Sequence, residues 1–490
     1  MKARGAGTDD HAATDGRAGE AAWNHAAAAE VFLRDSERTT WHDAALWFVR
    51  QRRDAAAGTV PEWETLRELA SAIKAHTMGQ LDHCLEAFEQ AATANGVTVH
   101  WARDAAEHNA TVHEILRDRD VRLVVKSKSM TTEECGLNGY LAGQGIEVVD
   151  TDLGERIVQL ERETPSHIVM PAIHHKKEDV AALFHRELGT DEIPDPAYLT
   201  EAARQHLRGA LVSAGAAMTG VNYAVAETGA IVVVTNEGNA DLGVHLAPLH
   251  IACMGIEKVI PRMEHLGVFL RLLARSATGQ PITAYTSHFR SPRPGADMHV
   301  VILDNGRSAQ LGRSDFRESL HCIRCGACIN TCPVYRRSGG HSYGVSTPGP
   351  IGSVLMPGVN LAAHASLPFA STLCGSCADV CPVKIDLPRQ LYRWRQIAVN
   401  AGYAPWWKRQ GVRRLASTLA HPGRYRLTGR LVRQLLRRAP GLMSGSAGRR
   451  LNPWSRAREL PPAAPESFRD WYVRERGDAQ ASGRPGEGGE

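Results

Sequence analysis

The chain has 490 residues, of which 43% are hydrophobic and 22% charged, and its formal net charge is +4. This length exceeds what one hydrophobic core usually fills, so two or three domains of soluble globular type are expected. No apolar run is long enough to span a bilayer, and the first 23 residues lack the apolar stretch of a secretory signal. These features predict a cytoplasmic protein, with a peripheral position at the inner membrane face left open.

The N-terminal part of the chain is predicted to be helical after a leader. Residues 1–59 are expected to form a disordered leader and an N-terminal helix. In residues 60–94, apolar side chains recur at steps of three and four, and Pro61 suits a first helical turn. The recurring residues are Leu66, Leu69, Ile73, Leu81, Leu85 and Phe88.

Short apolar segments then alternate with helical ones. The predicted strands are 97–101, 121–127, 145–152, 166–173, 222–239 and 298–306. The run from Thr131 to Glu134 is a capping pattern that predicts a helix continuing to Leu141. This alternation predicts an α/β domain at residues 60–308 with a mostly parallel sheet covered on both faces, but it does not give the strand order.

Seven of the ten cysteines lie between Cys322 and Cys381, clustered as metal ligands are. The stretch 321-HCIRCGACINTCPVY-335 has the spacing C-x2-C-x2-C-x3-C-P, and 371-STLCGSCADVCPVK-384 repeats it with Ser371 in place of the first cysteine. In two-cluster ferredoxins the cysteine before proline binds the other cluster. The spacing therefore predicts two iron–sulfur clusters, held by Cys322, Cys325, Cys328 and Cys381 (cluster 1) and by Cys332, Cys374 and Cys377 (cluster 2).

Both clusters are expected to be [4Fe-4S], but the second lacks an eighth cysteine. It could instead be a [3Fe-4S] cluster, or it could have an open iron or a fourth ligand other than a nearby cysteine. Ser371 is a poor ligand because its hydroxyl is hard and weakly acidic, and Cys135, His341 and His364 are remote alternatives. Zinc is disfavoured, since seven cysteines do not suit tetrahedral S4 sites and a zinc ribbon has no third ligand in such a run.

The cluster-binding region is expected to occupy residues 309–398, with an irregular insert at 339–352 between its halves. Residues 399–490 are predicted to form a basic helical segment with a disordered tail from residue 478. In residues 424–442, one side of a helix among arginines is lined by Leu427, Leu431, Leu435 and Leu436. Such a helix suits an acidic partner subunit or an anionic membrane surface; packing on the chain's own cluster region is the alternative.

A possible ligand pocket lies in the α/β region. Asn236, Glu237 and Asn239 follow the apolar run 230–235, where open α/β sheets bind ligands, and Glu227 could share the crevice. The alternative is a plain turn. His174 and His175 are adjacent and are expected in an exposed loop rather than on one ion. No catalytic residue is predicted, and no G-x-G-x-x-G fingerprint follows a strand.

Three further stretches, together with the cysteines, carry a family resemblance. They are 126-KSKSMTTEECGLN-138, 227-ETGAIVVVTNEGNADL-242 and 466-ESFRDWYVRER-476. With them the chain resembles the LutB/YkgF family, the iron–sulfur subunits of bacterial L-lactate utilisation, from about residue 60 to residue 476. The resemblance implies a LUD domain related to CoA transferases and sugar-phosphate isomerases, followed by an α-helical, ferredoxin-like domain with two clusters. Seven cluster cysteines in this spacing are also implied to be a family trait.

The resemblance implies that the chain is an electron-transfer subunit, not the site of chemistry, in a complex with partner subunits that oxidises L-lactate to pyruvate. The electron acceptor remains unknown. A subunit serving another 2-hydroxy acid such as glycolate, or a heterodisulfide-type reductase, is an alternative. A second alternative is a cluster-bearing regulator that binds nucleic acid through its basic tail. A third alternative is an active transferase or isomerase in the upstream domain. Of these partners, nucleic acid is not expected.

Overall fold

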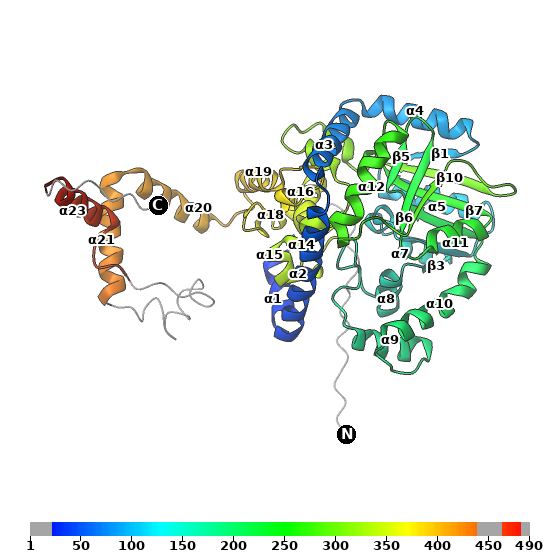
Figure 1. Cartoon of the computed structure of the whole chain (residues 1–490), viewed down its shortest axis with the longest axis horizontal. Helices are drawn as coiled ribbons and strands as arrows, with labels where there is room; N and C mark the ends of the chain where they lie inside the picture. The colour runs from blue at the N-terminus through cyan, green and yellow to red at the C-terminus, as the bar shows by residue number, and fades with distance from the viewer. Residues whose placement is uncertain (1–21, 439–462, 482–490) are drawn as a thin grey trace, which may run out of the picture. The chain divides into compact units, whose positions relative to one another are not determined.

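The computed structural model describes residues 22–438 and 463–481 (Figure 1). They fall into two compact units that divide after Tyr403. The first unit contains both the α/β part and the cysteine-rich helices. The predicted domain boundaries at residues 308 and 398 are therefore not tested by this division and stay predictions. The predicted leader lies in residues 1–21, outside the described ranges.

Four helices open the first unit. Helices α1 (His25–Leu33) and α2 (Ser36–Gly58) are capped by Asn24 and Asp35, whose side chains accept backbone N–H groups. The helical periodicity of residues 60–94 is confirmed by α3 (Trp63–Gly79) and α4 (Leu81–Ala94). Pro61 lies in the turn before α3 rather than in its first turn.

The predicted parallel sheet is present with six strands in the order β1-β10-β7-β4-β2-β3, and all neighbouring pairs are parallel. The sequence predictions for β1, β2, β3 and β10 are confirmed, whereas the central strands β4 and β7 were not predicted. The strands are β1 (Thr98–Ala102), β2 (Leu123–Lys126), β3 (Glu147–Asp150), β4 (Ala216–Gly220), β7 (Leu249–Gly255) and β10 (Asp297–Leu303).

Side chains from both faces of this sheet are buried, as expected for parallel strands. Helices α5 (Ala105–Arg117) and α7 (Leu137–Gly143) pack on one face, where Val124, Ile251 and Val301 lie. On the other face, α10 (Pro196–Ser213) and α11 (Asn239–Leu246) cover β2 and β4, and α4 covers β7 and β10. The remaining helices of the α/β part are α6 (Met130–Glu134), α8 (Leu153–Glu161), α9 (Lys177–Leu188), η1 (Ile256–Lys258), α12 (Met263–Thr278) and α13 (Arg307–Leu311).

A second sheet of four strands has the order β8-β5-β6-β9. The predicted strand at 222–239 is in fact the antiparallel hairpin of β5 (Tyr223–Val225) and β6 (Ala230–Thr235), which turns at Gly229. Strand β8 (Val259–Ile260) pairs with β5 in parallel, and β9 (Tyr285–Phe289) pairs with β6 antiparallel.

Two local sequence predictions are wrong. Residues 166–173 form turns instead of a strand, because the Nδ1 atom of His167 accepts the N–H groups of Val169 and Met170 and so replaces strand pairing. The helix predicted from Thr131 to Leu141 breaks at Gly136 into α6 and α7. Its cap is Ser129, whose hydroxyl accepts the N–H of Thr132.

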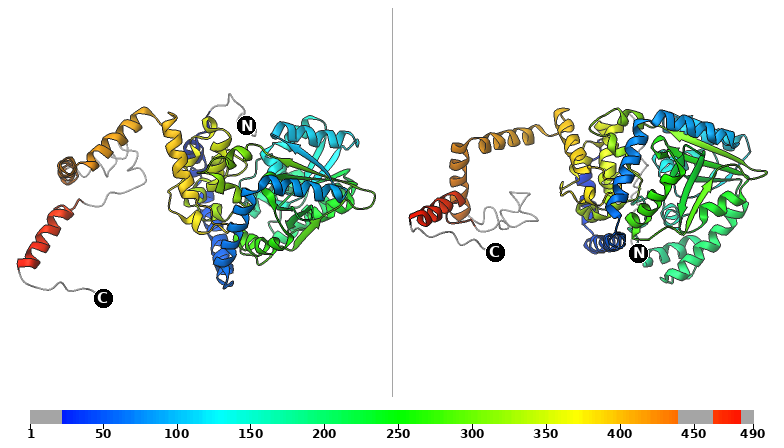
Figure 2. Two further views of the ribbon diagram at one scale, coloured as in Figure 1. Left: turned by 90° about the horizontal axis from the view of Figure 1, so that it is seen from above. Right: turned by 45° about the horizontal axis from the view of Figure 1, so that its top comes forward.

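The cysteine-rich region is helical and shares a hydrophobic core with α2, α3, α12 and the second sheet. Figure 2 shows the blue N-terminal helices between the yellow cysteine-rich helices and the green α/β part. The predicted irregular insert contains η3 (His341–Tyr343) and the start of α16 (Gly349–Val359). The other elements are η2 (Arg317–His321), α14 (Ala327–Thr331), α15 (Pro333–Ser338), α17 (Leu361–His364), η4 (Leu367–Phe369), α18 (Ser376–Asp379) and α19 (Leu387–Asn400).

The described part of the second unit consists of helices α20 (Trp406–Ala420), α21 (Pro422–Arg438) and α23 (Phe468–Ala481). Neither α20 nor α21 has a buried residue. Helix α23 extends into the tail predicted to be disordered, and residues 482–490 lie outside the described ranges. Within the described residues, no helix has the length and apolarity that crossing a membrane requires.

Replacing Gly229 with alanine should destabilise the first unit. Gly229 has φ +68°, and a Cβ atom there would lie 2.3 Å from the backbone nitrogen of Ala92 in α4. Strain and overlap with backbone atoms together should lower the free energy of unfolding by roughly 2–4 kcal/mol, measured by urea denaturation. Gly209→Ala is the control, because Gly209 is exposed in α10 with nothing within 4 Å of the added atom. An unchanged midpoint for Gly229→Ala would contradict the described hairpin packing.

Candidate iron–sulfur centre

The two cysteine stretches fold into loops of the same shape. Arg324 and Gly326 have positive φ angles in the first loop, and Leu373 and Gly375 have them at the matching positions of the second. Each loop runs directly into a short helix, α14 or α18. Glycine adopts this conformation without strain, which explains the glycine after Cys325 and after Cys374.

Ser371 keeps the local geometry of the cysteine that it replaces. In the first loop, the N–H of Arg324 donates to the Sγ atom of Cys322 at 3.4 Å. In the second, the N–H of Leu373 donates to the Oγ atom of Ser371 at 3.1 Å. The second loop is therefore a fully formed turn in which a hydroxyl takes the place of a thiol.

The first group of thiols includes one cysteine from the far end of the second stretch. Burial raises the pKa of Cys325, and the neighbouring thiolates of Cys322 and Cys381 raise it further. Burial likewise raises the pKa of Cys328, with Cys322, Cys325, Cys377 and Cys381 adding to the effect. The pKa of Cys381 rises to about 11 through burial, although N–H groups of Ile385 and Val383 oppose the rise.

The second group joins Cys332 to Cys374 and Cys377. Burial raises the pKa of Cys377 to about 12, and Cys332 and Cys374 contribute. Burial also raises the pKa of Cys332, against backbone N–H groups of Tyr335 and Val334, and Cys374 adds to the rise. Cys374 alone is exposed, and hydrogen bonds from the Ser376 backbone and the Thr372 side chain lower its pKa.

The other cysteines and histidines considered from the sequence lie elsewhere. Cys84 is buried in the core around α4, and Cys253 is buried within β7. Cys135 is buried in the core around α5 and α7. His341 contacts the carbonyl of Thr164, at 2.7 Å, and the ring of His174. His364 is buried in α17.

The donors around the thiols fit an iron–sulfur cluster. Closely spaced buried thiolates repel one another, so they ionise together only when a cation is bound. The hydroxyl of Tyr223 is buried, lies close enough to Cys325 and Cys322 for both to raise its pKa, and has no hydrogen-bond partner among the described residues. A buried hydroxyl normally has a partner, and a cluster sulfur would be one.

Arginines of the N-terminal helices hold the second cysteine loop, which sequence reasoning did not predict. Arg67 of α3 donates to the carbonyl oxygens of Cys381 at 3.0 Å and Asp379 at 2.7 Å. Arg53 of α2 donates to the carbonyl oxygen of Val380 at 3.2 Å. These arginines satisfy carbonyl groups at the end of α18 and place positive charge beside the thiols. Both arginines lie in polar segments far from the cysteines in the sequence, so no sequence pattern indicated that they contact the second cysteine loop.

A chain of buried ion pairs connects the first cysteine loop to the α/β part. Arg324 lies 3.6 Å from Glu257, which is paired with Arg307 at 2.6 Å. Arg307 also pairs with Glu134 at 2.8 Å. Glu134 belongs to the 126–138 stretch, so this stretch and the cysteine loop are part of one network. Burial lowers the pKa of Lys74, whose Nζ donates to the Glu257 carbonyl, to about 8.

The residues predicted to form a ligand pocket do not all meet. Asn236 bonds to Gln280 and to the N–H of Ala284, and Glu227 accepts the N–H of Met263 at the opposite end of β6. The antiparallel strand between them is six residues long, so Glu227 and Asn236 are about 20 Å apart along it.

Glu237 and Asn239 instead reach the carboxyl end of β3. Asn239 donates to Thr151 Oγ1 at 3.0 Å, and Glu237 accepts the N–H of Leu153 at 3.0 Å. Burial raises the pKa of Glu237 to about 7, and Asp152 contributes. The loop after β6 therefore contacts the edge of the parallel sheet where α/β proteins bind ligands.

A buried charged cluster at the same edge was missed from the sequence. Lys126 ends β2, is fully buried, and lies 2.8 Å from both Asp150 of β3 and Glu133. Glu155 lies 3.6 Å from the lysine nitrogen, and burial raises its pKa well above the usual range. The signal was a lysine and an aspartate ending two neighbouring apolar strands. One ammonium among three carboxyl groups favours a proton on Glu155.

Comparisons with known proteins agree with both parts of the chain. Residues 85–307 match the LUD domain model, and residues 318–385 match the 4Fe-4S dicluster domain model. The match to the dicluster domain shows that the cysteine-rich part is an iron–sulfur domain. Among solved structures, a DUF162 family protein from Deinococcus radiodurans gives a TM-score of 0.26 at 15% identity, over 46% of this chain and 98% of that one.

Curated relatives extend over most of the chain. Lactate utilization protein B of Bacillus pumilus is 41% identical over 88% of this chain and 93% of its own length. That of Shouchella clausii is 40% identical over 86% and 91%, and the uncharacterized electron transport protein YkgF of Escherichia coli is 38% identical over 86% and 90%. The chain belongs to the lactate utilization protein B (LutB/YkgF-type) family.

Proposed function

We propose that this chain is the electron-transfer iron–sulfur subunit of a complex that oxidises L-lactate to pyruvate. The observation that carries the proposal is the crossed grouping of the seven clustered thiols. Cys381, which precedes a proline in the second stretch, lies near thiols of the first stretch, and Cys332, which precedes a proline in the first stretch, lies near thiols of the second. The names of the relatives, lactate utilization protein B and electron transport protein, support the substrate and the role.

The proposed ligands follow the electrostatic neighbours of each thiol. Cys322, Cys325, Cys328 and Cys381 bind the first cluster. Cys332, Cys374 and Cys377 bind the second, with three thiolates. When bound, such clusters accept and release one electron at a time, at potentials set by charge, hydrogen bonds and burial.

The surroundings of the thiols suit this role. The first group is largely buried, which excludes water, and Arg53, Arg67 and Lys74 bring positive charge toward it. Positive charge and N–H donors stabilise the more negative, reduced state and so raise its potential. The second group includes the exposed Cys374, so an electron enters or leaves the chain most directly there.

The second unit is proposed to contact a partner subunit of the complex. Helices α20 and α21 have exposed apolar side chains among arginines, and their lack of buried residues leaves one face free within the described residues. The exposed apolar residues are Trp406, Trp407, Val412, Leu415, Leu419, Tyr425, Leu427, Leu431, Val432 and Leu435. An anionic membrane surface is the alternative target.

Single cysteine replacements test the ligand assignment. Cys381→Ala should remove the EPR signal of the first cluster, although Cys381 belongs to the second stretch, and Cys332→Ala should remove that of the second. In each variant the iron content should fall by about half, because each cluster contributes roughly half of the iron. Cys84→Ala is the control, since Cys84 lies in the core around α4. Loss of the same signal in both variants would contradict the crossed arrangement.

Tyr223→Phe tests whether this hydroxyl donates to the first cluster. One lost hydrogen bond of about 1 kcal/mol should lower the reduction potential by roughly 40 mV for one electron, measured by EPR-monitored redox titration. Tyr392→Phe is the control, because Tyr392 is 55% exposed in α19. Equal potentials in Tyr223→Phe and the unchanged protein would exclude the proposed hydrogen bond.

EPR of the complex, isolated anaerobically through this chain, tests the function itself. Adding L-lactate should change the cluster signals, and the type of signal distinguishes [3Fe-4S] from [4Fe-4S] at the second site. Clusters that respond to glycolate and not to L-lactate would reassign the substrate. Steeply salt-dependent DNA binding without any response to 2-hydroxy acids would favour a regulator instead.

A further inference from the structure

The two cysteine loops repeat the same backbone hydrogen bonds at the same spacing. The carbonyl oxygen of Gly326 accepts the N–H groups three and four residues later, at 2.9 and 3.1 Å, and that of Gly375 does the same at 2.9 and 3.1 Å. Two residues before these glycines, φ is +58° in the first loop and +56° in the second. Each residue of the second loop therefore takes the place of one residue of the first, and Ser371 takes the place of Cys322.

The Ser371 hydroxyl has the bonding pattern of a cluster-binding thiol. Cys322 Sγ accepts one backbone N–H, from Arg324, at 3.4 Å, and Ser371 Oγ accepts the matching N–H of Leu373 at 3.1 Å. Within residues 22–438 and 463–481, Ser371 Oγ has no other hydrogen-bond partner. Its proton and its second lone pair are therefore unused, and because Ser371 is partly exposed the proton can pass to water.

Arg395 of α19 fixes the backbone at Ser371. Its guanidinium donates to the carbonyl oxygens of Pro368 at 2.8 Å and Ser371 at 2.6 Å, and it lies 5.4 Å from the centre of the Phe369 ring. These contacts hold the segment that enters the second loop and bring a positive charge close to the hydroxyl. A nearby positive charge favours the deprotonated form of an acidic group.

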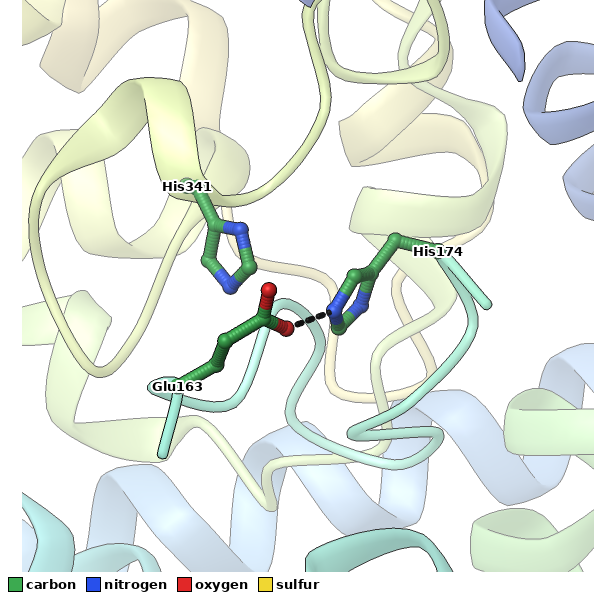
Figure 3. Close-up of side chains that lie close together, drawn as sticks. All are labelled: Glu163, His174 and His341. Atoms are coloured by element: carbon green, nitrogen blue, oxygen red, sulfur yellow. Dashed lines mark hydrogen bonds and ion pairs between the residues drawn. The ribbon is translucent and has the colours of Figure 1, made fainter. Parts of the chain in front are cut away.

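Two other side chains considered as a fourth ligand are engaged elsewhere. His341 begins η3, and its ring centre lies 4.6 Å from that of His174. Figure 3 shows the His341 ring beside His174 and Glu163, which belong to the α/β part. Cys135 is buried in the core around α5 and α7. Of the remote alternatives, His364 alone remains for experiment.

The contacts of Glu163 also correct one sequence prediction. His174 and His175 were expected in an exposed loop, which is wrong for His174, because its side chain is 4% exposed. The Nε2 atoms of both rings lie within hydrogen-bond distance of Glu163 Oε2, at 2.7 and 3.0 Å. These side chains satisfy one another, and we infer no metal site from them.

We propose that Ser371 Oγ is the fourth ligand of the second iron–sulfur cluster. This inference rests on the proposed function, in which Cys332, Cys374 and Cys377 bind that cluster. As the iron–oxygen bond forms, the hydroxyl proton leaves to solvent and no electron is transferred. A bound cation strongly lowers the pKa of a group that it coordinates, which overcomes the weak acidity of a free serine. An alkoxide is harder than a thiolate, so it favours the oxidised state of the iron and lowers the reduction potential.

The first test replaces Ser371 in the anaerobically purified full-length chain, which should contain about eight iron atoms as two [4Fe-4S] clusters. On mild oxidation with ferricyanide, Ser371→Ala should lose about one iron atom per chain and give a [3Fe-4S] EPR signal, because its fourth iron lacks a protein ligand. Ser371→Cys should keep both [4Fe-4S] clusters, and the potential of the second should rise. Ser314→Ala, an exposed serine before the first cysteine stretch, should behave like the unchanged chain.

Three results would overturn the proposal. Ser371→Ala could retain all of its iron, or the unchanged chain could lose an iron atom as readily as Ser371→Ala, which would indicate an open iron. The third result is loss of that iron in His364→Ala while Ser371→Ala keeps it, which would assign the ligand to the histidine. An unchanged EPR signal of the first cluster in each variant shows that the variant is folded.

Cys374→Ala separates the inference from the proposed function on which it rests. This variant should lose the EPR signal of the second cluster. If the signal persists, the ligand assignment fails and the inference fails with it. If the signal is lost while Ser371→Ala resists oxidation, the three thiolates are confirmed as ligands and the serine alone is excluded.

Discussion

The rest of the first unit depends on the burial of mutually repelling thiols in a shared core. Five of the seven clustered cysteines are buried beside apolar side chains from α2, α3, α12 and the second sheet. Thiolates in such surroundings require positive charge close by. The chain supplies it from helices remote in sequence, through Arg53 and Arg67, which also satisfy backbone carbonyls at the second loop.

That requirement explains why the α/β part and the cysteine-rich part share one core. Arg324 sits inside the first cysteine loop, and its partner Glu257 follows the central strand β7. Glu257 and Glu134 are both held by the buried Arg307. Removing Glu257 would leave Arg324 without its ion-pair partner, and removing Arg307 would leave Glu134 without its own; leaving a buried charge unpaired costs several kcal/mol. The network thus couples the geometry of the loop to that of the parallel sheet.

Features of local pattern were predictable from the sequence, and features of distant pairing were not. Strands β2 and β10 were recognised because they are rich in valine and isoleucine. The central strands AAMTG and LHIACMG were missed, because alanine, glycine and methionine give little strand preference. Residues 166–173 looked like a strand, but His167 and Ser166 hydrogen-bond to their own backbone.

The same division holds for the sites. The C-x2-C-x2-C-x3-C-P spacing predicts which thiols share a cluster because that geometry is local and repeated. Lys126 and Asp150 come together only through the parallel pairing of β2 with β3. Glu163 and His341 meet only because the insert folds back onto the α/β part. Neither contact is indicated by the spacing of residues in the sequence, so both could be found only from the structure.

The absent eighth cysteine is best understood from the loop that should contain it. Ser371 accepts the N–H of Leu373 as Cys322 accepts the N–H of Arg324, and Leu373 and Gly375 keep the matching positive φ angles. A degenerate loop would have no reason to keep this strained conformation, which costs about 1–3 kcal/mol at a residue such as Leu373. The loop also contains Cys374, the exposed member of the seven. Under the proposed ligand assignment, the second cluster has three thiolates, and its side without a thiolate lies in the loop that contains the exposed Cys374, where a proposed electron-transfer partner could reach it.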